Sequence, residues 1–299
     1  VRIVARARKE LGYQLTIADL FSHPTIEQLA AKQSLCVHAP APAPSGDRGA
    51  LTLSVAQRRL WILEQMRPGT AAFTISGAWT INGPLDYDRW DKAWQALVIR
   101  HDALRSYFVA AGEEVIPREL EAATLGTEHF DCSDDPHPMQ QAVEQLEVRA
   151  AEAFDLSQGP LFRMIRFRLS DQQHLLLLSL HHIVSDGWSM ELIMREFSGL
   201  YNQEITPAEL PPATPYRAFA QQQNEGIKAA PGTKLRDYWS QKLAAPLEAL
   251  NMPTDFTRPK EMTAIGQAAE FRLPGAATNA LKSFVAAADS TVFMGLVTL

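Results

Sequence analysis

Two adjacent histidines, His181 and His182, precede an aspartate, Asp186, in the stretch HHIVSDGWS at residues 181–189. An imidazole has a pKa near 6.5, so a histidine can act as a general base at neutral pH. Histidine is also a common metal ligand. The same residues would equally suit two core histidines beside a helix that Asp186 caps. A catalytic turn, a metal site and a structural turn are therefore the three interpretations to separate.

The neighbouring sequence indicates that this stretch joins a strand to a helix. The run HLLLLSL, residues 174–180, is short and apolar, as expected of a buried strand. Gly187 can adopt positive φ, and a helix is expected to begin near Trp188. Such a turn leaves backbone N–H groups free at the positive end of the helix dipole.

Strand geometry separates the two histidines. Successive side chains of a strand point to opposite faces, so His181 and His182 should not both face one cavity. One is expected to support the fold and the other to reach the site. The same alternation disfavours a metal held by the pair, and no further ligand residue lies at a suitable spacing. Spacing alone leaves open the structural alternative, with Asp186 as a helix cap.

Composition predicts a globular protein with a substantial core. The chain has 299 residues, 46% of them hydrophobic, with 6 Trp and 13 Phe, which suits one large or two smaller domains. Its 28 Lys+Arg against 34 Asp+Glu form no basic block, so nucleic-acid binding has little support. No apolar run approaches the roughly 20 residues that a membrane helix needs. The two cysteines match neither a disulfide framework nor a zinc pattern, and a cytoplasmic location is the expectation.

An Ala/Pro-rich linker at residues 34–50, SLCVHAPAPAPSGDRGA, divides the sequence. Alternating Ala-Pro favours extended, semi-rigid geometry. Residues 1–33 before it are predicted to be a small helical piece, in which Thr25 and Gln28 have the spacing of a capping box. The first residues already follow a helical pattern and the last ones form an uncapped apolar segment, so we expect a longer polypeptide at both ends.

Residues 51–225 carry mixed helix and strand patterns, and residues 226–299 continue them as the expected start of a second lobe. Helices are predicted at 54–66, 85–101, 139–154, 188–202, 234–243 and 279–288. Strands are predicted at 72–83, 161–169, 174–182 and 268–273, with a hairpin over 104–117.

A resemblance to a known family favours the catalytic interpretation. HHIVSDGWS resembles the HHxxxDG signature of condensation domains in nonribosomal peptide synthetases. LTLSVAQRRLWILEQ, residues 51–65, resembles the family's opening segment, Ser-x-Ala-Gln-x-Arg-Leu-Trp. RHDALRSYF, residues 100–108, resembles its Arg-His-Glu-x-Leu-Arg-Thr-x-Phe segment, from which Asp102 and Ser106 depart. FDLSQGPLFR, YRAFAQQQ and NMPTDFTRP also look like family stretches, and together the matches cover about residues 51–260.

The first 33 residues resemble the C-terminal part of a peptidyl carrier domain, since LFSHPTIEQLA at 20–30 is typical of its final helices. In that family the serine that bears 4'-phosphopantetheine lies a few residues before the point where this sequence begins. No residue here is therefore assigned that role.

The resemblance implies an α/β (α+β) fold similar to chloramphenicol acetyltransferase, with two lobes, a tunnel between them and the second lobe truncated here. It implies amide bond formation between an upstream carrier-bound thioester and the amine of a downstream carrier-bound aminoacyl thioester. The implied partners are the upstream and downstream peptidyl carrier domains and an adenylation domain. The implied 4'-phosphopantetheine belongs to the carriers, and no cofactor or metal is expected on the condensation domain itself.

The resemblance also implies residue roles. His182 is expected to face the tunnel and to accept a proton from the attacking amine, or to orient that amine, while His181 supports the fold. Asp186 is expected to pair with Arg105, with Arg100 as the reserve partner. If that pair is buried, breaking it from one side would cost roughly 3–5 kcal/mol.

Three residues near the motif have two interpretations each. The backbone N–H of Gly187 either approaches the thioester oxygen or belongs to a simple turn. Ser189 either positions substrate or makes an early helix hydrogen bond. Trp188 is expected to pack against the protein rather than to touch substrate.

Two rival functions remain at this point. An epimerisation domain of the same superfamily shares the signature, although the opening SVAQRRLW favours condensation. A heterocyclisation domain is disfavoured because histidines stand where that type has aspartate. A non-catalytic docking platform that recruits a tailoring enzyme is the rival from another class, and the intact His182 and Asp186 argue against it.

Overall fold

A computed structural model describes residues 25–31, 52–112, 114–244, 246–247, 251–257, 269 and 271–298. The chain divides into two compact units, residues 1–253 and 254–299, which we describe separately. The α-helices are α3 (Ile26–Ala31), α4 (Val55–Met66), α5 (Tyr87–Arg100), α6 (Pro138–Ala151), α7 (Gly187–Tyr201), α8 (Tyr216–Lys228), α9 (Ala230–Lys242), α10 (Gly275–Ala287) and α11 (Val292–Thr298). The strands are β1 (Thr74–Asn82), β2 (Ser106–Ala111), β3 (Glu114–Glu119), β4 (Glu128–Asp131), β5 (Phe162–Ser170) and β6 (Gln173–His181). Two short 3-10 helices are η1 (Asp102–Arg105) and η2 (Ala122–Thr124).

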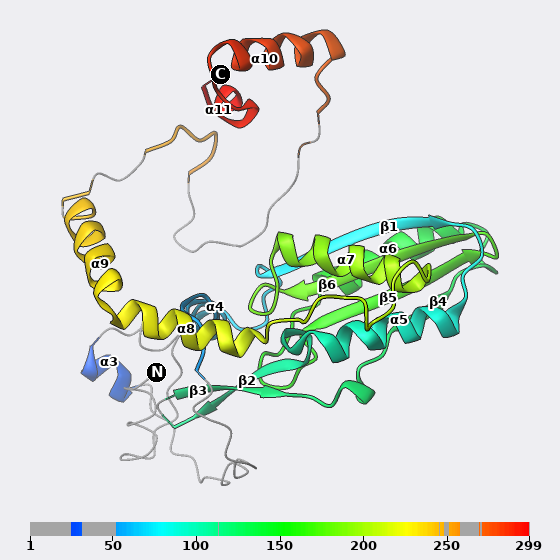
Figure 1. Cartoon of the computed structure of the whole chain (residues 1–299), viewed down its shortest axis with the longest axis horizontal. Coiled ribbons are helices and arrows are strands. Elements are labelled where there is room, and N and C mark those ends of the chain that lie inside the picture. Colours follow the sequence, from blue (N-terminus) through cyan, green and yellow to red (C-terminus); the bar gives the residue numbers. More distant parts are fainter. Residues whose placement is uncertain are drawn as a thin grey trace. The chain divides into compact units, whose positions relative to one another are not determined.

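A four-stranded mixed sheet in the order β1-β6-β5-β4 forms the centre of the first unit (Figure 1). Strand β6 pairs antiparallel with both β1 and β5, whereas β4 pairs parallel with β5. The parallel pair requires a crossover, which α6 supplies. Strands β2 and β3 form the separate hairpin that the sequence predicts.

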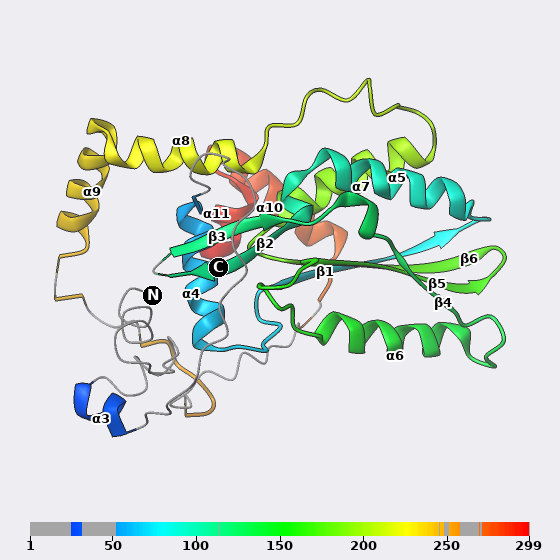
Figure 2. The same cartoon turned by 90° about the horizontal axis from the view of Figure 1, so that it is seen from below.

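Helices cover both faces of this sheet, with α5 and α7 on one side and α6 on the other (Figure 2). The alternation along β6 follows from this arrangement. Leu176, Leu178 and Leu180 belong to the core with α5 and α7, whereas Leu175 and Leu177 belong to the core with α6. Two buried faces explain why the strand is a continuous apolar run rather than an alternating pattern.

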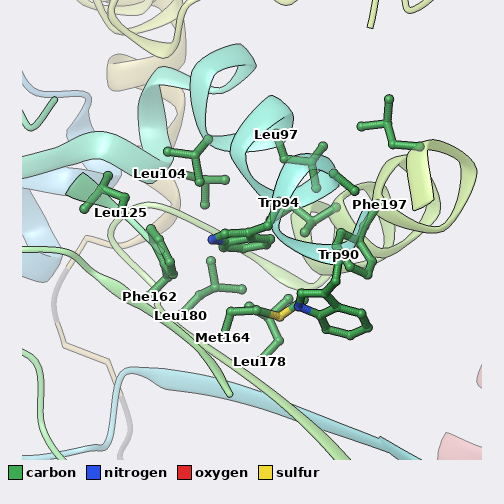
Figure 3. Packing of buried hydrophobic residues seen from close by; sticks show 14 of the residues in the cluster. Trp90, Trp94, Leu97, Leu104, Leu125, Phe162, Met164, Leu178, Leu180 and Phe197 are labelled. Atoms are coloured by element: carbon green, nitrogen blue, oxygen red, sulfur yellow. The ribbon is translucent and has the colours of Figure 1, made fainter. Parts of the chain in front are cut away.

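The core between the sheet and α5 is built on the apolar stripe of that helix (Figure 3). Its members, Trp90, Ala93, Trp94, Leu97 and Val98, are all buried, as their helical spacing predicts. The Trp94 ring packs edge-on against Phe162 at a centroid distance of 5.0 Å, and Trp90 packs similarly against Phe197 of α7 at 4.6 Å. These contacts fix α5 and α7 beside the end of β6.

The second unit contains α10 and α11 among its described residues. The helix predicted at 279–288 is confirmed by α10, but the strand predicted at 268–273 is wrong for the residues of it that are described. A strand needs a neighbour for its backbone groups, and residues 271–273 have none among the described residues, with Phe271 84% exposed. The helix expected at the start of the chain lies outside the described residues, whereas the Thr25 cap is present, bonded to the Gln28 N–H at 3.2 Å.

In the part of the chain that the structure describes, no single helix has the length and apolar character to cross a membrane. Helices α10 and α11 reach that length and composition only together, and they meet at a bend of 103°.

Candidate active site

The predicted strand-turn-helix arrangement is present around HHIVSDGWS. Strand β6 ends at His181, and α7 begins at Gly187 with Asp186 as its N-cap. The His181 N–H donates to the Leu161 carbonyl at 2.9 Å, and the His182 N–H donates to the Phe73 carbonyl at 2.7 Å. The two histidines are thereby held by segments on opposite sides of β6.

His181 is buried, with 1% of its surface exposed. Its Nδ1 accepts the Ile183 N–H at 3.0 Å, so in the neutral ring the proton belongs on Nε2. The rings of Phe73 and Phe154 lie near it, each with a centroid distance of 6.3 Å. The supporting role predicted for His181 is consistent with this setting.

His182 is exposed, and it lies in the turn directly after β6, which ends at His181. Its Nδ1 lies 2.9 Å from the Ser185 carbonyl oxygen. Because a carbonyl only accepts, Nδ1 carries the proton and Nε2 keeps its lone pair. His182 therefore offers a base on a ring whose orientation is fixed from within the turn.

A cavity of about 600 Å³ lies beside the turn. Its wall includes His182, Asp186 and Ser189 from the motif. Other parts of the wall come from α4, from residues 101–104 at the end of α5, from α7, and from the segment that leads into α8. His181, Gly187 and Arg105 are not part of it. The cavity thus collects the motif's exposed polar side chains and leaves out its buried histidine.

Asp186 acts as the cap of α7. Its Oδ1 accepts the Ser189 N–H at 2.8 Å and the Ser189 hydroxyl at 2.7 Å. Both bonds lower the pKa of the Asp186 carboxyl, and the bond from the Ser189 hydroxyl has the larger effect. Nearby His182 lowers this pKa further. Ser189 makes the early helix contact that was one of its two predicted roles, and it also lines the cavity.

Comparisons with known proteins assign the chain to one family. The model of the family described as Condensation domain matches residues 47–299. The chain belongs to the condensation domain family. The model described as Phosphopantetheine attachment site matches residues 1–32. These matches confirm the resemblance of both parts of the sequence.

The curated relatives of this condensation domain are much longer synthases. A plipastatin synthase subunit of Bacillus subtilis (strain 168) is 32% identical over 98% of this chain and 11% of its own length. Surfactin synthase subunit 1 of the same organism is 29% identical over 99% of this chain and 8% of its own length. Tyrocidine synthase 3 of Brevibacillus parabrevis is 31% identical over 98% of this chain and 4% of its own length. The chain therefore spans about a tenth or less of these relatives.

Solved structures support the fold. The starter condensation domain of the rhizomide synthetase RzmA superposes with a TM-score of 0.58 at 21% identity, over 65% of this chain and 48% of that one. The SgcC5 protein from Streptomyces globisporus superposes with a TM-score of 0.61 at 24% identity, over 81% of this chain and 57% of that one. The mixed α/β fold of the chloramphenicol-acetyltransferase type is thereby confirmed. The domain boundaries at residues 33, 50 and 225 stay predictions.

The predicted ion pair between Asp186 and Arg105 is wrong. The Arg105 guanidinium donates to the carbonyls of Val98 and Ile99 at 2.5 and 2.7 Å and to Glu119 at 3.2 Å. These carbonyls belong to the last turn of α5, where a cation is favoured. The condensation domain uses Arg105 to join the end of α5 to the hairpin, not to clamp the motif.

The reserve partner, Arg100, is also engaged elsewhere. It donates to Glu196 of α7 at 3.1 Å and to the Pro211 carbonyl at 2.6 Å. His101 donates to the same Glu196 carboxylate from Nε2, at 2.8 Å. Glu196 is buried, and this paired arrangement satisfies its charge while it joins α5 to α7.

Two further predictions near the motif need correction. Positive φ occurs at Gly69, Gly83, Gly112 and Gly159 among the described residues, and Gly187 is not one of them. A Cβ on Gly187 would meet nothing within 4 Å. Trp188 does not pack as expected, since 77% of its surface is exposed.

Sequence reasoning missed several wall residues of the cavity. His101, Asp102 and Tyr216 all line it, and the Tyr216 N–H donates to Asp102 at 3.0 Å. The stretches RHDALRSYF and YRAFAQQQ had both matched the family, so the signal was present without a role attached to it. In the described residues, no group of three or more His, Cys, Asp or Glu side chains has the geometry to hold a metal ion.

Proposed function

We propose that this condensation domain forms an amide bond between a carrier-bound acyl or peptidyl thioester and the amine of a second, carrier-bound aminoacyl thioester. One observation carries the proposal. His182 lies on the wall of a cavity of about 600 Å³ with its Nδ1 bonded to Ser185, and its Nε2 has no hydrogen bond among the described residues. A free imidazole nitrogen on a ring of fixed orientation is what an attacking amine requires at neutral pH.

The reaction proceeds by acyl transfer to nitrogen. The amine nitrogen bonds to the thioester carbonyl carbon, and the carbon–sulfur bond breaks. His182 Nε2 takes the proton that the nitrogen loses and returns it to the departing thiolate, so the donor carrier ends with a free thiol. No oxidant, reductant or metal takes part in this balance.

The carbonyl oxygen gains negative charge during the attack and needs a donor. The N-terminus of α7 presents free N–H groups at its positive end, beside His182. Neither of the usual structural reasons for a glycine applies at residue 187 among the described residues. A Cβ there would meet no neighbouring atom, and the backbone is not left-handed. Gly187 does not line the cavity itself but follows the wall residue Asp186, and we propose its backbone N–H as the donor to a thioester oxygen that approaches the first turn of α7. Ser189 belongs to the cap and to the cavity wall.

The partners follow from the reaction. Upstream and downstream peptidyl carrier domains deliver the two thioesters on 4'-phosphopantetheine arms, and an adenylation domain loads the carriers. The match of residues 1–32 to a phosphopantetheine attachment family supports a carrier segment in the same polypeptide. The long synthase relatives support a multidomain assembly in which this chain is one part, and we propose that the assembly is cytoplasmic. The arm is substrate, and the condensation domain itself binds no cofactor in this scheme.

Replacing His182 by Ala tests the proposal. The full-length polypeptide with both carriers loaded should lose amide formation by roughly 10²–10⁴-fold, the usual effect of removing a general base. Because His182 is exposed, the melting temperature should stay near that of the wild type. His137→Ala, which removes another exposed histidine, is the matched control.

The same assay separates the rival functions. Amide product at the wild-type rate in His182→Ala would contradict the assigned base. Exchange of the α-carbon proton without amide product would indicate epimerisation. Neither reaction, together with tight binding of another enzyme, would indicate a docking platform.

A further inference from the structure

We propose that Glu64 of α4 is a positioning residue for amide formation, acting on His182 through the ring of His181. This inference rests on the proposed function, because it concerns the same turn. It starts from an arrangement that the mechanism above does not use. Glu64 and His181 are both buried, with 4% and 1% of their surfaces exposed, and Glu64 Oε2 lies 3.7 Å from His181 Nε2.

Neither atom has a hydrogen-bond partner in the described part of the chain. A carboxylate is seldom buried unless it is paired, because desolvation of the charge is costly. A charge-assisted N–H···O bond is about 2.7–2.9 Å long, so this pair is roughly 0.8 Å from a full hydrogen bond. Hydrogen bonds around catalytic groups are often long without substrate and tighten when it binds. The separation of 3.7 Å between Glu64 and His181 suits a bond that tightens in this way.

The tautomer of His181 determines which residue of the pair donates and which accepts. Its Nδ1 already accepts the Ile183 N–H, so the neutral ring carries its proton on Nε2, which faces Glu64. A carboxylate in this place holds the tautomer and the ring plane together. Glu64 thus keeps Nδ1 available for the backbone of the turn.

Hydrogen bonds continue from His181 to His182. The His181 carbonyl accepts the Ser185 hydroxyl at 3.2 Å and the Val184 N–H at 3.0 Å. The Ser185 carbonyl in turn accepts from Nδ1 of His182 at 2.9 Å. A rotation of the His181 ring would release Ile183, loosen the turn and move the carbonyl that orients His182.

Helix α4 carries both the cavity wall and the tether. Arg59, Leu60 and Leu63 line the cavity, and Glu64 follows directly. Gln57 of the same helix donates from Nε2 to the Ile183 carbonyl at 3.3 Å, a second contact between α4 and the turn. A substrate that presses on α4 therefore also acts on His181. Helix α4 thereby couples substrate binding in the cavity to the orientation of the His182 ring.

The first measurement uses the wild-type 299-residue chain. Nitrogen-15 NMR of the histidine rings should show the His181 proton on Nε2 and the His182 proton on Nδ1. A His181 proton on Nδ1 would overturn the proposal, whatever the variants do.

The second measurement compares variants of two neighbouring residues on α4. Glu64→Met removes the acceptor at similar length, Glu64→Gln keeps an acceptor oxygen, and Gln65→Met is the control for the same change one residue along. Glu64→Met should disturb the His182 ring signals and lower kcat of the full-length polypeptide roughly 10–100-fold with KM unchanged. Glu64→Gln should restore the ring signals and most of the rate, and Gln65→Met should match the wild type.

Wild-type ring signals and kcat in Glu64→Met, with a lower melting temperature alone, would make Glu64 a merely structural residue and end the proposal. The ring signals do not depend on turnover. If His182→Ala retained full activity, the proposed function would fail, while the NMR comparison would still decide the tether between Glu64 and His182.

Discussion

The residues of the motif divide their work by burial. His181 is buried against Phe73 and Phe154, His182 is exposed at the cavity, and Asp186 caps the next helix. Among the described residues, the Asp186 side chain bonds only to Ser189 in its own helix turn, so its loss should cost what a cap costs. That is about 1 kcal/mol rather than the 3–5 kcal/mol of a broken buried ion pair.

We therefore expect Asp186→Ala to lower the free energy of unfolding by about 1 kcal/mol, within a range of 0.5–2. Asp186→Asn should preserve it, because Asn caps a helix as well as Asp does. Urea unfolding of the two variants measures the difference. Equal losses in both would show that charge, and not capping, is what Asp186 contributes.

At this scale the sequence predicts what is local and misses what is distant. Strand alternation predicts opposite settings for His181 and His182, which the structure has, although His182 lies in the turn just past β6. The capping role of Asp186 follows from its place before a helix. The partners of Arg105 were missed although they are local, because the pairing with Asp186 was taken from the family resemblance and not from the nearby end of α5 and the β2–β3 hairpin. The contact of Glu64 with His181 cannot be predicted from the sequence either, because His181 belongs to a strand far along the chain.

Among the elements, α4 links several parts of the site. Its N-cap Ser54 is fully buried and forms a capping box with Gln57. The Ser54 hydroxyl also lies 3.0 Å from the hydroxyl of Tyr216, at the start of α8. The capping box joins residues three apart in the sequence, whereas the contact with α8 joins residues 162 apart and depends on the fold. The strand predicted at 268–273 shows the reverse case, because the local pattern of residues 271–273 has no neighbouring strand among the described residues.

Ser54→Ala should lower the free energy of unfolding by about 1–2 kcal/mol, because it removes the cap of α4 and the partner of the Tyr216 hydroxyl together. Ser198→Ala, at an exposed position of α7, should stay within about 0.5 kcal/mol of the wild type. Chemical unfolding of both variants tests this. A cost for Ser54→Ala no larger than for Ser198→Ala would contradict the role of the capping box in holding α4.

In the molecule as a whole, the same device of an aspartate beside a serine recurs at distant turns. Asp131 accepts from Ser133, Asp155 from Ser157, and Asp186 from Ser189. Each serine hydroxyl is the largest cause of a lowered carboxyl pKa. The sheet order that spreads these turns across the fold depends on long-range strand pairing, which composition and periodicity do not reveal.

Acid stability should follow from these carboxyls. The pKa of Asp131 falls to about 2, because Ser133 donates a hydroxyl and an N–H to it and Arg168 adds a bond. An unfolded Asp titrates near 3.9, so the stabilisation is complete above about pH 5 and is lost as the pH falls from about 4 towards 2. Asp131→Asn should flatten the decrease of the melting temperature across that window and leave the value at pH 7 lower than in the wild type. Asp134→Asn, an exposed neighbour without a hydrogen bond in the described residues, should change neither. A decrease below pH 4 that is as steep in Asp131→Asn as in the wild type would show that this carboxyl is not held in its ionised form by the fold.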